Sequence, residues 1–356
     1  MEKILVINPG STSTKIAVYE DLEQKFVTSI EHSAEEIEKY DAIFDQYEFR
    51  KDLILGEIKN HGVEPSELTC VVARGGLLPP VPAGAFRVNQ DMVDQLKYHP
   101  VNEHASNLGA PIALAIADAN GIPAYIYDPV TVDELEPIAR FTGVPEMQRK
   151  GIGHNLNMRA MAIKYAADQG KAYSDITAIV VHMGGGITVS IHKNGRIVDT
   201  VNDEEGPFSP ERAGGLPTPQ VIDMAFSGEY DKKAMKKKFK NSSGLQAYLG
   251  TKDAREVEKL IESGDENAKL VYQAMAYQIS KEIGALSTVV GGKVDAIILT
   301  GGIAYSKMFT DWIAERTGFI APVAVLAGEN EMDALAGGAY RVQTGQEEAM
   351  SFKKNF

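Results

Sequence analysis

The segment Asn8-Pro-Gly-Ser-Thr-Ser-Thr-Lys15 places several phosphate-binding groups within eight residues. Backbone amides and the Lys15 ammonium would supply positive potential, and the Asn8 carboxamide and the hydroxyls of Ser11 and Ser13 can hold a metal-bound water. It is not a Walker loop, because the G-x-x-x-x-G-K-[ST] spacing is absent. The alternative interpretation is an ordinary polar hairpin turn.

Two apolar runs must position this segment. Ile4–Ile7 precedes it and Ile16–Tyr19 follows it, which predicts two strands joined by a tight turn. Gly10 is expected to adopt a backbone conformation closed to other residues.

The same pattern recurs later in the chain. Residues 178–192 predict a second hairpin around Gly184-Gly-Gly186, and the apolar runs 68–74 and 294–300 each end at a Gly-Gly pair, Gly75-Gly76 and Gly301-Gly302. We therefore expect a duplicated α/β domain with mixed sheets and a cleft between the copies. A chance recurrence is the alternative, since apolar strands ending in glycine are common.

Helical patterns separate these strands. Residues 108–120 carry Pro111 in the first turn and Gly121 just past the end, which is typical of a helix. Apolar periodicity predicts further helices at 154–169, 265–290 and 332–343.

Composition excludes several kinds of protein. The formal net charge of −13 makes the chain a poor candidate for binding nucleic acid or an anionic membrane. No apolar run approaches the length of a membrane span, and the start does not resemble a signal peptide. The single cysteine, Cys70, lies in an apolar run and fits a reducing compartment. A cytoplasmic location is expected.

Several ordered motifs over the whole chain resemble the acetate kinase family of carboxylic acid kinases, which belongs to the actin-like superfamily together with sugar kinases. The motifs that carry the resemblance are the Asn8–Lys15 segment, Arg74-Gly-Gly-Leu-Leu78, Glu103-His-Ala-Ser-Asn-Leu-Gly109, Tyr127-Asp-Pro129, Arg149–Asn157, His182-Met-Gly-Gly-Gly186 and Thr300-Gly-Gly-Ile303. The resemblance implies two actin-like (ribonuclease H-like) α/β domains around a central nucleotide cleft. The first would comprise residues 1–147 with the C-terminal helix 332–356, and the second residues 148–331.

The resemblance also implies an activity: reversible, ATP-dependent phosphorylation of a short-chain fatty acid, with butyrate expected, to the acyl phosphate by direct in-line transfer. ATP and Mg²⁺ are the implied cofactors, the acid and ATP the implied small-molecule partners, and a homo-oligomer, dimer or higher, the implied assembly. The alternatives are a kinase for isobutyrate, propionate or acetate, and a non-catalytic actin-like ATPase switch.

Residue roles follow from the resemblance. It implies catalytic roles for Arg74, His154, Arg212 and Asp128, and magnesium binding by Asn8 and Glu331. Nucleotide or phosphate contacts would come from Asn8, Ser11, Ser13, Lys15, His182, Gly184, Gly185, Gly186, Gly301 and Gly302, and the acid would meet His104, Gly76 and Leu77.

Structural alternatives exist for most of these residues. Arg212 can pair with the neighbouring Glu211, and Asp128 can be a turn residue before a proline. His154 and His104 can be capping or surface groups, and His182 can be a core strand residue. Glu331 can be a charge at a helix N-terminus.

The implied chemistry suits these residue types. A carboxylate, with a reference pKa of about 4, is already a nucleophile at neutral pH, so the obstacle is repulsion between the acid and the phosphates. Arg74 can fork onto carboxylate or phosphate oxygens. Gly76 stands where acetate kinases carry a valine, so we expect space there for the longer acid, with Leu77 on the apolar wall. The alternative is that Gly75-Gly76 serves backbone geometry alone.

Overall fold

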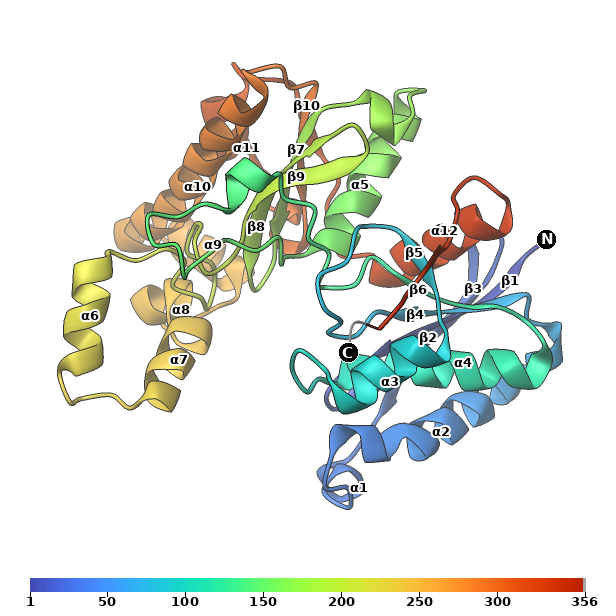
Figure 1. Ribbon diagram of the computed structural model, residues 1–356. Coiled ribbons are helices and arrows are strands. Elements are labelled where there is room, and N and C mark those ends of the chain that lie inside the picture. The colour runs from blue at the N-terminus through green and yellow to red at the C-terminus, as the bar shows by residue number, and fades with distance from the viewer. Residues whose placement is uncertain (355–356) are drawn as a thin grey trace. The chain divides into compact units, whose positions relative to one another are not determined.

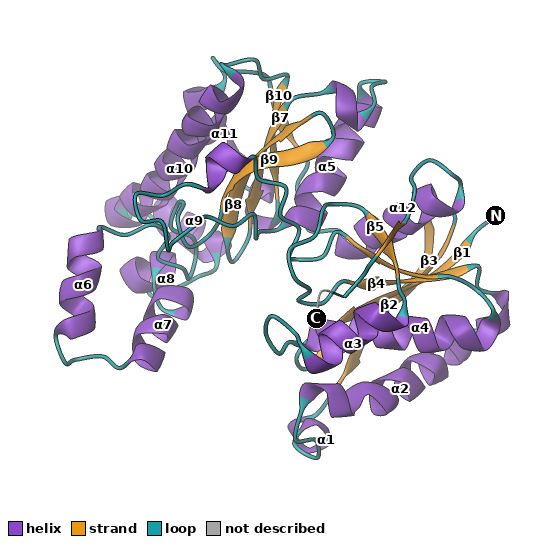
Figure 2. Ribbon diagram, in the orientation of Figure 1, coloured by secondary structure: helices purple, strands orange, loops and turns teal. Residues whose placement is uncertain are grey.

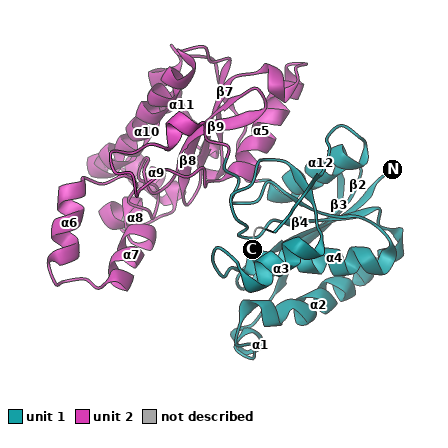
Figure 3. Cartoon of the chain, in the orientation of Figure 1, with its two compact units in different colours: residues 1–133, 330–356 teal, residues 134–329 magenta. Residues whose placement is uncertain are grey.

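The computed structural model describes residues 1–354, which form two compact units, each with its own sheet (Figure 3). Unit 1 comprises residues 1–133 and 330–356, and unit 2 comprises residues 134–329. The sequence placed these boundaries at 147 and 331. Residues 134–147 belong to unit 2 because they attach to its edge strand: the Glu134 carboxylate accepts the Ile197 amide at 3.0 Å, and the Glu136 amide donates to the Val198 carbonyl at 2.9 Å.

The unit 1 sheet combines antiparallel and parallel strands (Figures 1 and 2). Within the described residues its order is β12-β5-β6-β4-β1-β2-β3. The strands are β1 Lys3–Pro9, β2 Ser13–Glu20, β3 Glu23–Glu31, β4 Cys70–Arg74, β5 Ala85–Arg87, β6 Ala124–Tyr127 and β12 Met350–Ser351. The hairpin β1–β2–β3 is antiparallel, whereas β4 and β6 run parallel to β1.

Helices cover both faces of this sheet. The helices of unit 1 are α1 Ala34–Ile37, α2 Tyr47–Asn60, α3 Gln90–Tyr98, α4 Gly109–Asn120 and α12 Glu331–Gln343. The helices α2, α3 and α4 pack with Leu5 and Ile7 in one core, and α12 covers the opposite face. This two-sided cover explains why Ile4–Ile7 is buried without alternation, as in the parallel strands of α/β proteins.

Unit 2 repeats the strand pattern. Its order is β11-β10-β7-β8-β9, with β7–β8–β9 antiparallel and β10 and β11 parallel to β7. The strands are β7 Ala178–Met183, β8 Ile187–Lys193, β9 Arg196–Val201, β10 Ala296–Thr300 and β11 Val323–Val325. This order matches β6-β4-β1-β2-β3 strand for strand, so the predicted duplication and mixed sheets are confirmed at the level of topology.

The unit 2 sheet is also covered on both faces. Its helices are α5 Asn155–Asp168, α6 Thr218–Phe226, α7 Lys232–Asn241, α8 Gly244–Leu249, α9 Ala254–Glu262, α10 Glu266–Ser287 and α11 Lys307–Thr317. Ile179 and Val181 of β7 pack with α10 and α11, whereas Val180 packs with α5. In the described part of the chain, no helix combines the length and apolar character needed to cross a membrane.

Two adjacent glycines of α12 offer a test of how this helix docks on the sheet of unit 1. A Cβ at Gly338 would overlap the Tyr127 ring of β6, whereas a Cβ at Gly337 would lie 3.5 Å from the nearest atom, Nη1 of Arg341. We expect Gly338→Ala to destabilise the protein by about 1–3 kcal/mol through overpacking. Gly337→Ala should be neutral, or stabilising by up to about 1 kcal/mol.

Thermal unfolding of the two variants beside the parent protein measures the difference. Equal unfolding temperatures for the two variants would show that close packing of Gly338 on Tyr127 does not hold α12 in place.

Candidate active site

The turn between β1 and β2 carries the first group of predicted site residues. The Gly10 amide donates to the Ser13 carbonyl at 2.7 Å, and Asn8 lies opposite Lys15 in the hairpin register. Ser11 and Lys15 are exposed. The expectation of a special backbone conformation at Gly10 is wrong, because Gly10 is not among the glycines with positive φ. What favours glycine there is space: a Cβ would lie 3.3 Å from the Ser13 carbonyl oxygen.

Three predicted residues meet at the ends of β1, β4 and α12. Arg74 is the last residue of β4, and its Nη1 donates to both carboxylate oxygens of Glu331, at 2.6 and 2.7 Å. The Asn8 Nδ2 donates to the same carboxylate at 2.8 Å. Both charged side chains remain about a third exposed, so this cluster can exchange its internal contacts for a ligand.

His104 lies near this cluster, before the short helical turn 105–108. Its Nδ1 bonds the Ser106 hydroxyl at 2.8 Å and accepts the Ser106 amide at 3.2 Å. Desolvation, and then the Arg74 charge, lower the pKa of His104. The capping role considered from the sequence is therefore present, and the Arg74 charge acts on this histidine.

The expected space beside Gly76 is absent, which corrects the sequence-based explanation for this glycine. A Cβ at Gly76 would lie 2.7 Å from Asn107 Oδ1 and 2.8 Å from Leu96 Cδ2. The same Asn107 Oδ1 accepts the Leu77 amide at 2.8 Å. Gly76 thus permits close packing rather than opening an acid pocket, which is the alternative that the sequence analysis set beside it.

Asp128 directly follows β6 and is buried, with a φ of +38°. Its Oδ1 accepts the Gly84 amide at 2.6 Å, and its own amide donates to the Gly84 carbonyl at 3.1 Å. Aspartate tolerates this left-handed conformation better than most residues. Asp128 thus has the structural turn role considered from the sequence, and its catalytic role stays a prediction.

In unit 2 the Gly184–Gly186 turn joins β7 to β8, and two of its glycines make room for functional side chains. A Cβ at Gly184 would lie 2.5 Å from a Glu329 oxygen, and one at Gly186 would lie 2.6 Å from Arg212 Nη1. Gly185 is exposed, and its carbonyl accepts the Ser209 hydroxyl at 2.7 Å.

His182, the second-last residue of β7, lies in a network of polar groups. Its Nε2 lies 3.1 Å from a Glu329 oxygen, and its Nδ1 lies 3.1 Å from Asn157 Nδ2. The side-chain Nδ2 of Asn157 also donates to the Thr300 hydroxyl at 3.2 Å. Within residues 1–354, the buried Oδ1 of Asn157 has no hydrogen-bond partner. His182 is therefore buried as a core strand residue would be, yet it is bonded to a carboxylate.

His154 stacks on His182 with ring centroids 4.0 Å apart, and its Nδ1 bonds the Thr188 hydroxyl at 2.9 Å. Burial, and then the positive potential of His182, lower the pKa of His154 to about 3. His154 is consequently neutral at physiological pH, so it would act as a hydrogen-bonding group rather than as a cation.

The remaining predicted residues of unit 2 are Arg212, Gly301 and Gly302. Arg212 forms an ion pair with Asp203, not with the neighbouring Glu211 considered from the sequence. Gly301 has a φ of +88°, and a Cβ there would overlap the Met183 carbonyl, so this position requires glycine. Gly302 is exposed with open space around it.

Sequence reasoning missed Asp203, Glu329 and Asn157. Each has its partner more than five residues away along the chain, so no local spacing marks it. Glu329 did have a signal, because it lies two residues before Glu331, which the sequence analysis selected.

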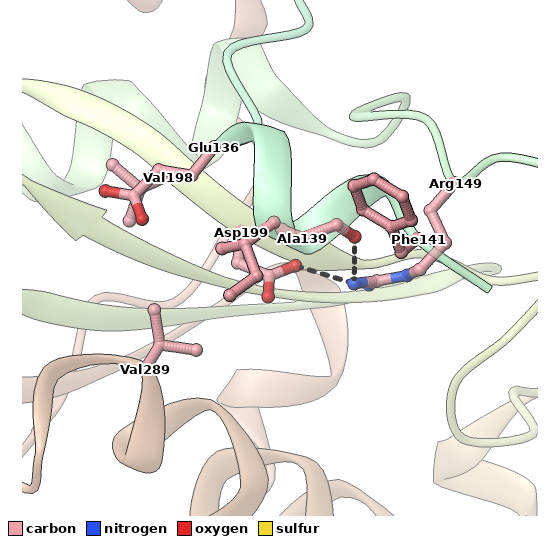
Figure 4. Close-up of a pocket in the computed structure, with 8 residues that line it drawn as sticks. Glu136, Ala139, Phe141, Arg149, Val198, Asp199 and Val289 are labelled. Carbon is pink, nitrogen blue, oxygen red and sulfur yellow. Dashed lines mark hydrogen bonds and ion pairs between the residues drawn. The ribbon is translucent and has the colours of Figure 1, made fainter.

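A separate pocket of about 380 Å³ lies in unit 2, lined by Glu136, Ile138, Ala139, Phe141, Arg149, Val198, Asp199 and Val289. Arg149 Nη1 donates to the Ala139 carbonyl at 2.9 Å and to Asp199 at 3.0 Å (Figure 4). No predicted site residue lines this pocket.

Comparison with known proteins decides the family. The chain is 50% identical over 353 residues to butyrate kinase 2 of Clostridium acetobutylicum, covering 99% of each chain. The chain belongs to the acetokinase family. The model of that family matches residues 149–314.

Solved structures of low sequence identity share the actin-like α/β fold with mixed sheets, which confirms the fold predicted from the resemblance. The acetate kinase of Porphyromonas gingivalis has a TM-score of 0.80 at 17% identity, covering 98% of this chain and 100% of its own. A propionate kinase from Francisella tularensis has a TM-score of 0.73 at 18% identity, covering 95% and 99%.

The lowered pKa of His154 gives a direct prediction for this acetokinase family member. Because the folded-state pKa lies below the ordinary value of about 6.5, the ring should stay neutral from pH 8 down to about pH 4. Histidine ring resonances, assigned by comparison with a His154→Gln variant, should show no titration of His154 over that range. A midpoint near 6.5 for His154 would contradict the burial argument.

Proposed function

We propose that this protein catalyses the reversible, ATP-dependent phosphorylation of a short-chain fatty acid, with butyrate preferred, to give the acyl phosphate and ADP. Family membership and the close relative named butyrate kinase 2 support the reaction class and the acid. The observation that carries the proposal is the contact of Arg74 Nη1 with both oxygens of the Glu331 carboxylate.

That contact shows that Arg74 is placed to bind an oxyanion. A carboxylate and a phosphate both present paired oxygens, so a substrate anion can take the place that the Glu331 carboxylate holds. The carboxylate of the acid needs no general base, because it is ionised at neutral pH. The protein's task is to position it and to neutralise charge.

The other unit 1 groups would serve the phosphates. Lys15 and the hydroxyls of Ser11 and Ser13 are proposed to bind the phosphate chain of ATP, beside exposed backbone amides of the same turn. His104 and the Leu77 region are proposed to contact the acid.

In unit 2, the Gly184–Gly186 backbone and the Gly301-Gly302 turn are proposed to bind the nucleotide. Arg212, held by Asp203, would contact phosphate oxygens, and neutral His154 would donate a hydrogen bond to them. His182 is proposed to support this surface through its contact with Glu329.

Magnesium is the proposed metal, and the residues present fit it. Mg²⁺ is usually held by one or two protein oxygen ligands together with water and phosphate. Within residues 1–354 no group of three or more His, Cys, Asp or Glu side chains is placed to hold a metal ion. Asn8 and Glu331, joined at 2.8 Å, would hold the ion. When bound, it would neutralise phosphate charge.

A cytoplasmic location and a homo-oligomeric state, dimer or higher, remain part of the proposal. Buried Cys70, whose thiol pKa is raised to about 12 by burial, is unreactive and fits a reducing compartment.

The reaction is tested by acyl hydroxamate formation with ATP and magnesium across acetate, propionate, butyrate, isobutyrate and valerate. We expect the highest kcat/KM with butyrate and no activity when magnesium is omitted. A preference for another of these acids would leave the class of reaction intact and overturn the choice of butyrate. Failure with all five acids would remove the kinase proposal and favour the nucleotide-switch alternative.

Arg74→Ala and Arg212→Ala should each lower kcat by on the order of 10²-fold, because each removes a charge that stabilises the transition state. Arg74→Lys should recover little, since an ammonium lacks the planar set of N–H donors with which a guanidinium can bind two substrate oxygens at once. The control is Arg87→Ala, which removes an exposed arginine of β5 and should leave kcat unchanged. Turnover of Arg74→Ala close to that of the control would exclude Arg74 from the reaction.

A further inference from the structure

A guanidinium lies buried behind the β1–β2 turn. Arg50, on helix α2, is only 1% exposed, and it was not selected by sequence reasoning. Its Nη1 donates to the Gly10 carbonyl at 2.7 Å and to the Ser13 carbonyl at 3.3 Å, and its Nη2 donates to the Ser11 carbonyl at 3.1 Å. Arg50 therefore holds three carbonyl oxygens of one short turn.

The remaining hydrogen bonds of this guanidinium go to neutral side chains. Nη1 donates to the Thr14 hydroxyl at 3.1 Å, and Nε and Nη2 donate to Gln46 Oε1 at 3.1 and 2.8 Å. His32 bonds the same Thr14 hydroxyl at 2.8 Å, and burial and then Arg50 lower its pKa, so it adds no charge at neutral pH.

Arg50 has no carboxylate partner within residues 1–354. Burial lowers its pKa to about 10, which still leaves it charged at neutral pH. An uncompensated buried charge is costly, and a purely structural clamp does not require one. The positive potential is thus available to an anion bound on the outer side of the turn.

The carbonyl contacts also orient the amides. In a trans peptide the C=O and N–H bonds point in opposite directions. Because the Gly10 and Ser11 carbonyls point toward Arg50, the amides of Ser11 and Thr12 point away from it. In the described part of the chain neither amide donates a hydrogen bond, and both residues are exposed. Successive free amides in a turn form an anion-binding concavity.

We propose that Arg50 is a positioning residue for polyphosphate binding: it directs the Ser11 and Thr12 amides outward and supplies unpaired positive charge behind them. The ligand is the phosphate chain of the nucleotide, and this inference rests on the proposed function for its physiological ligand. Arg50 acts through the turn and does not itself touch the phosphates.

The test compares Arg50→Met, which removes the charge and the fork, with Arg50→Lys, which retains the charge alone. Arg341→Met is the matched control, because Arg341 is a well-bonded arginine of the same unit whose partners are Tyr127 and Glu347. Calorimetric titration with tripolyphosphate measures the turn's affinity without any acid, and steady-state kinetics give KM for ATP and for butyrate separately.

We expect Arg50→Met to bind tripolyphosphate at least tenfold more weakly than the parent protein and to show a similarly raised KM for ATP. Arg50→Lys should be intermediate, while KM for butyrate stays within about twofold in both variants. Arg341→Met should lower the melting temperature without changing the affinity for tripolyphosphate or the KM for ATP. Thermal unfolding of every variant separates loss of folded protein from loss of affinity.

Parent-like tripolyphosphate affinity in Arg50→Met would overturn the proposal, as would an equal rise in both KM values or a parent protein that does not bind tripolyphosphate. If Arg50→Met does not fold, Arg50→Lys decides by the same criteria. If no acid is phosphorylated but Arg50→Met still loses tripolyphosphate affinity, the kinase proposal fails and the role of Arg50 stands.

Discussion

Repulsion between two anions is the constraint on which this structure depends. A carboxylate can attack a phosphate only where positive groups offset the charge of both. Two unit charges 4 Å apart interact with an energy of about 4 kcal/mol at an effective dielectric of 20. In unit 1 the offset comes from Arg74, which is held in place by Glu331 until a ligand competes for it. Helix α12, the last helix of the described chain, supplies that carboxylate and so completes a cluster begun by β1 and β4.

The repeated strand order explains why polar groups collect where they do. In each unit an antiparallel hairpin is extended by parallel strands, so a glycine-containing turn lies beside the carboxyl ends of the parallel strands. In unit 1 this arrangement brings the Asn8 end of β1 beside Arg74. In unit 2 it brings His182 beside Thr300. Glycines at these ends admit side chains and carbonyls that a Cβ would exclude, as at Gly184 and Gly301.

Sequence patterns predict the secondary-structure elements that are determined by interactions between residues close together in the chain. The hairpins and helix α4, with Pro111 and Gly121, appear where apolar runs and helix-end residues indicated, because those signals lie within each element. Arg50 was missed because α2 is charged on both sides of it, so the sequence resembles a solvated helix face. Gly76 was misinterpreted because a glycine that opens a pocket and one that permits close packing look identical in sequence. Asp203 and Glu329 find their partners only through tertiary contacts.

The central claim is that the carboxylate of the acid attacks the terminal phosphorus of ATP. Butyrate labelled with ¹⁸O in both carboxylate oxygens tests it most directly, with the acyl phosphate product observed by ³¹P NMR. The account predicts that phosphorus becomes bonded to one ¹⁸O, the bridging oxygen of butyryl phosphate. A product whose phosphorus carries no ¹⁸O would contradict it, because the bridging oxygen would then have come from a group other than the acid.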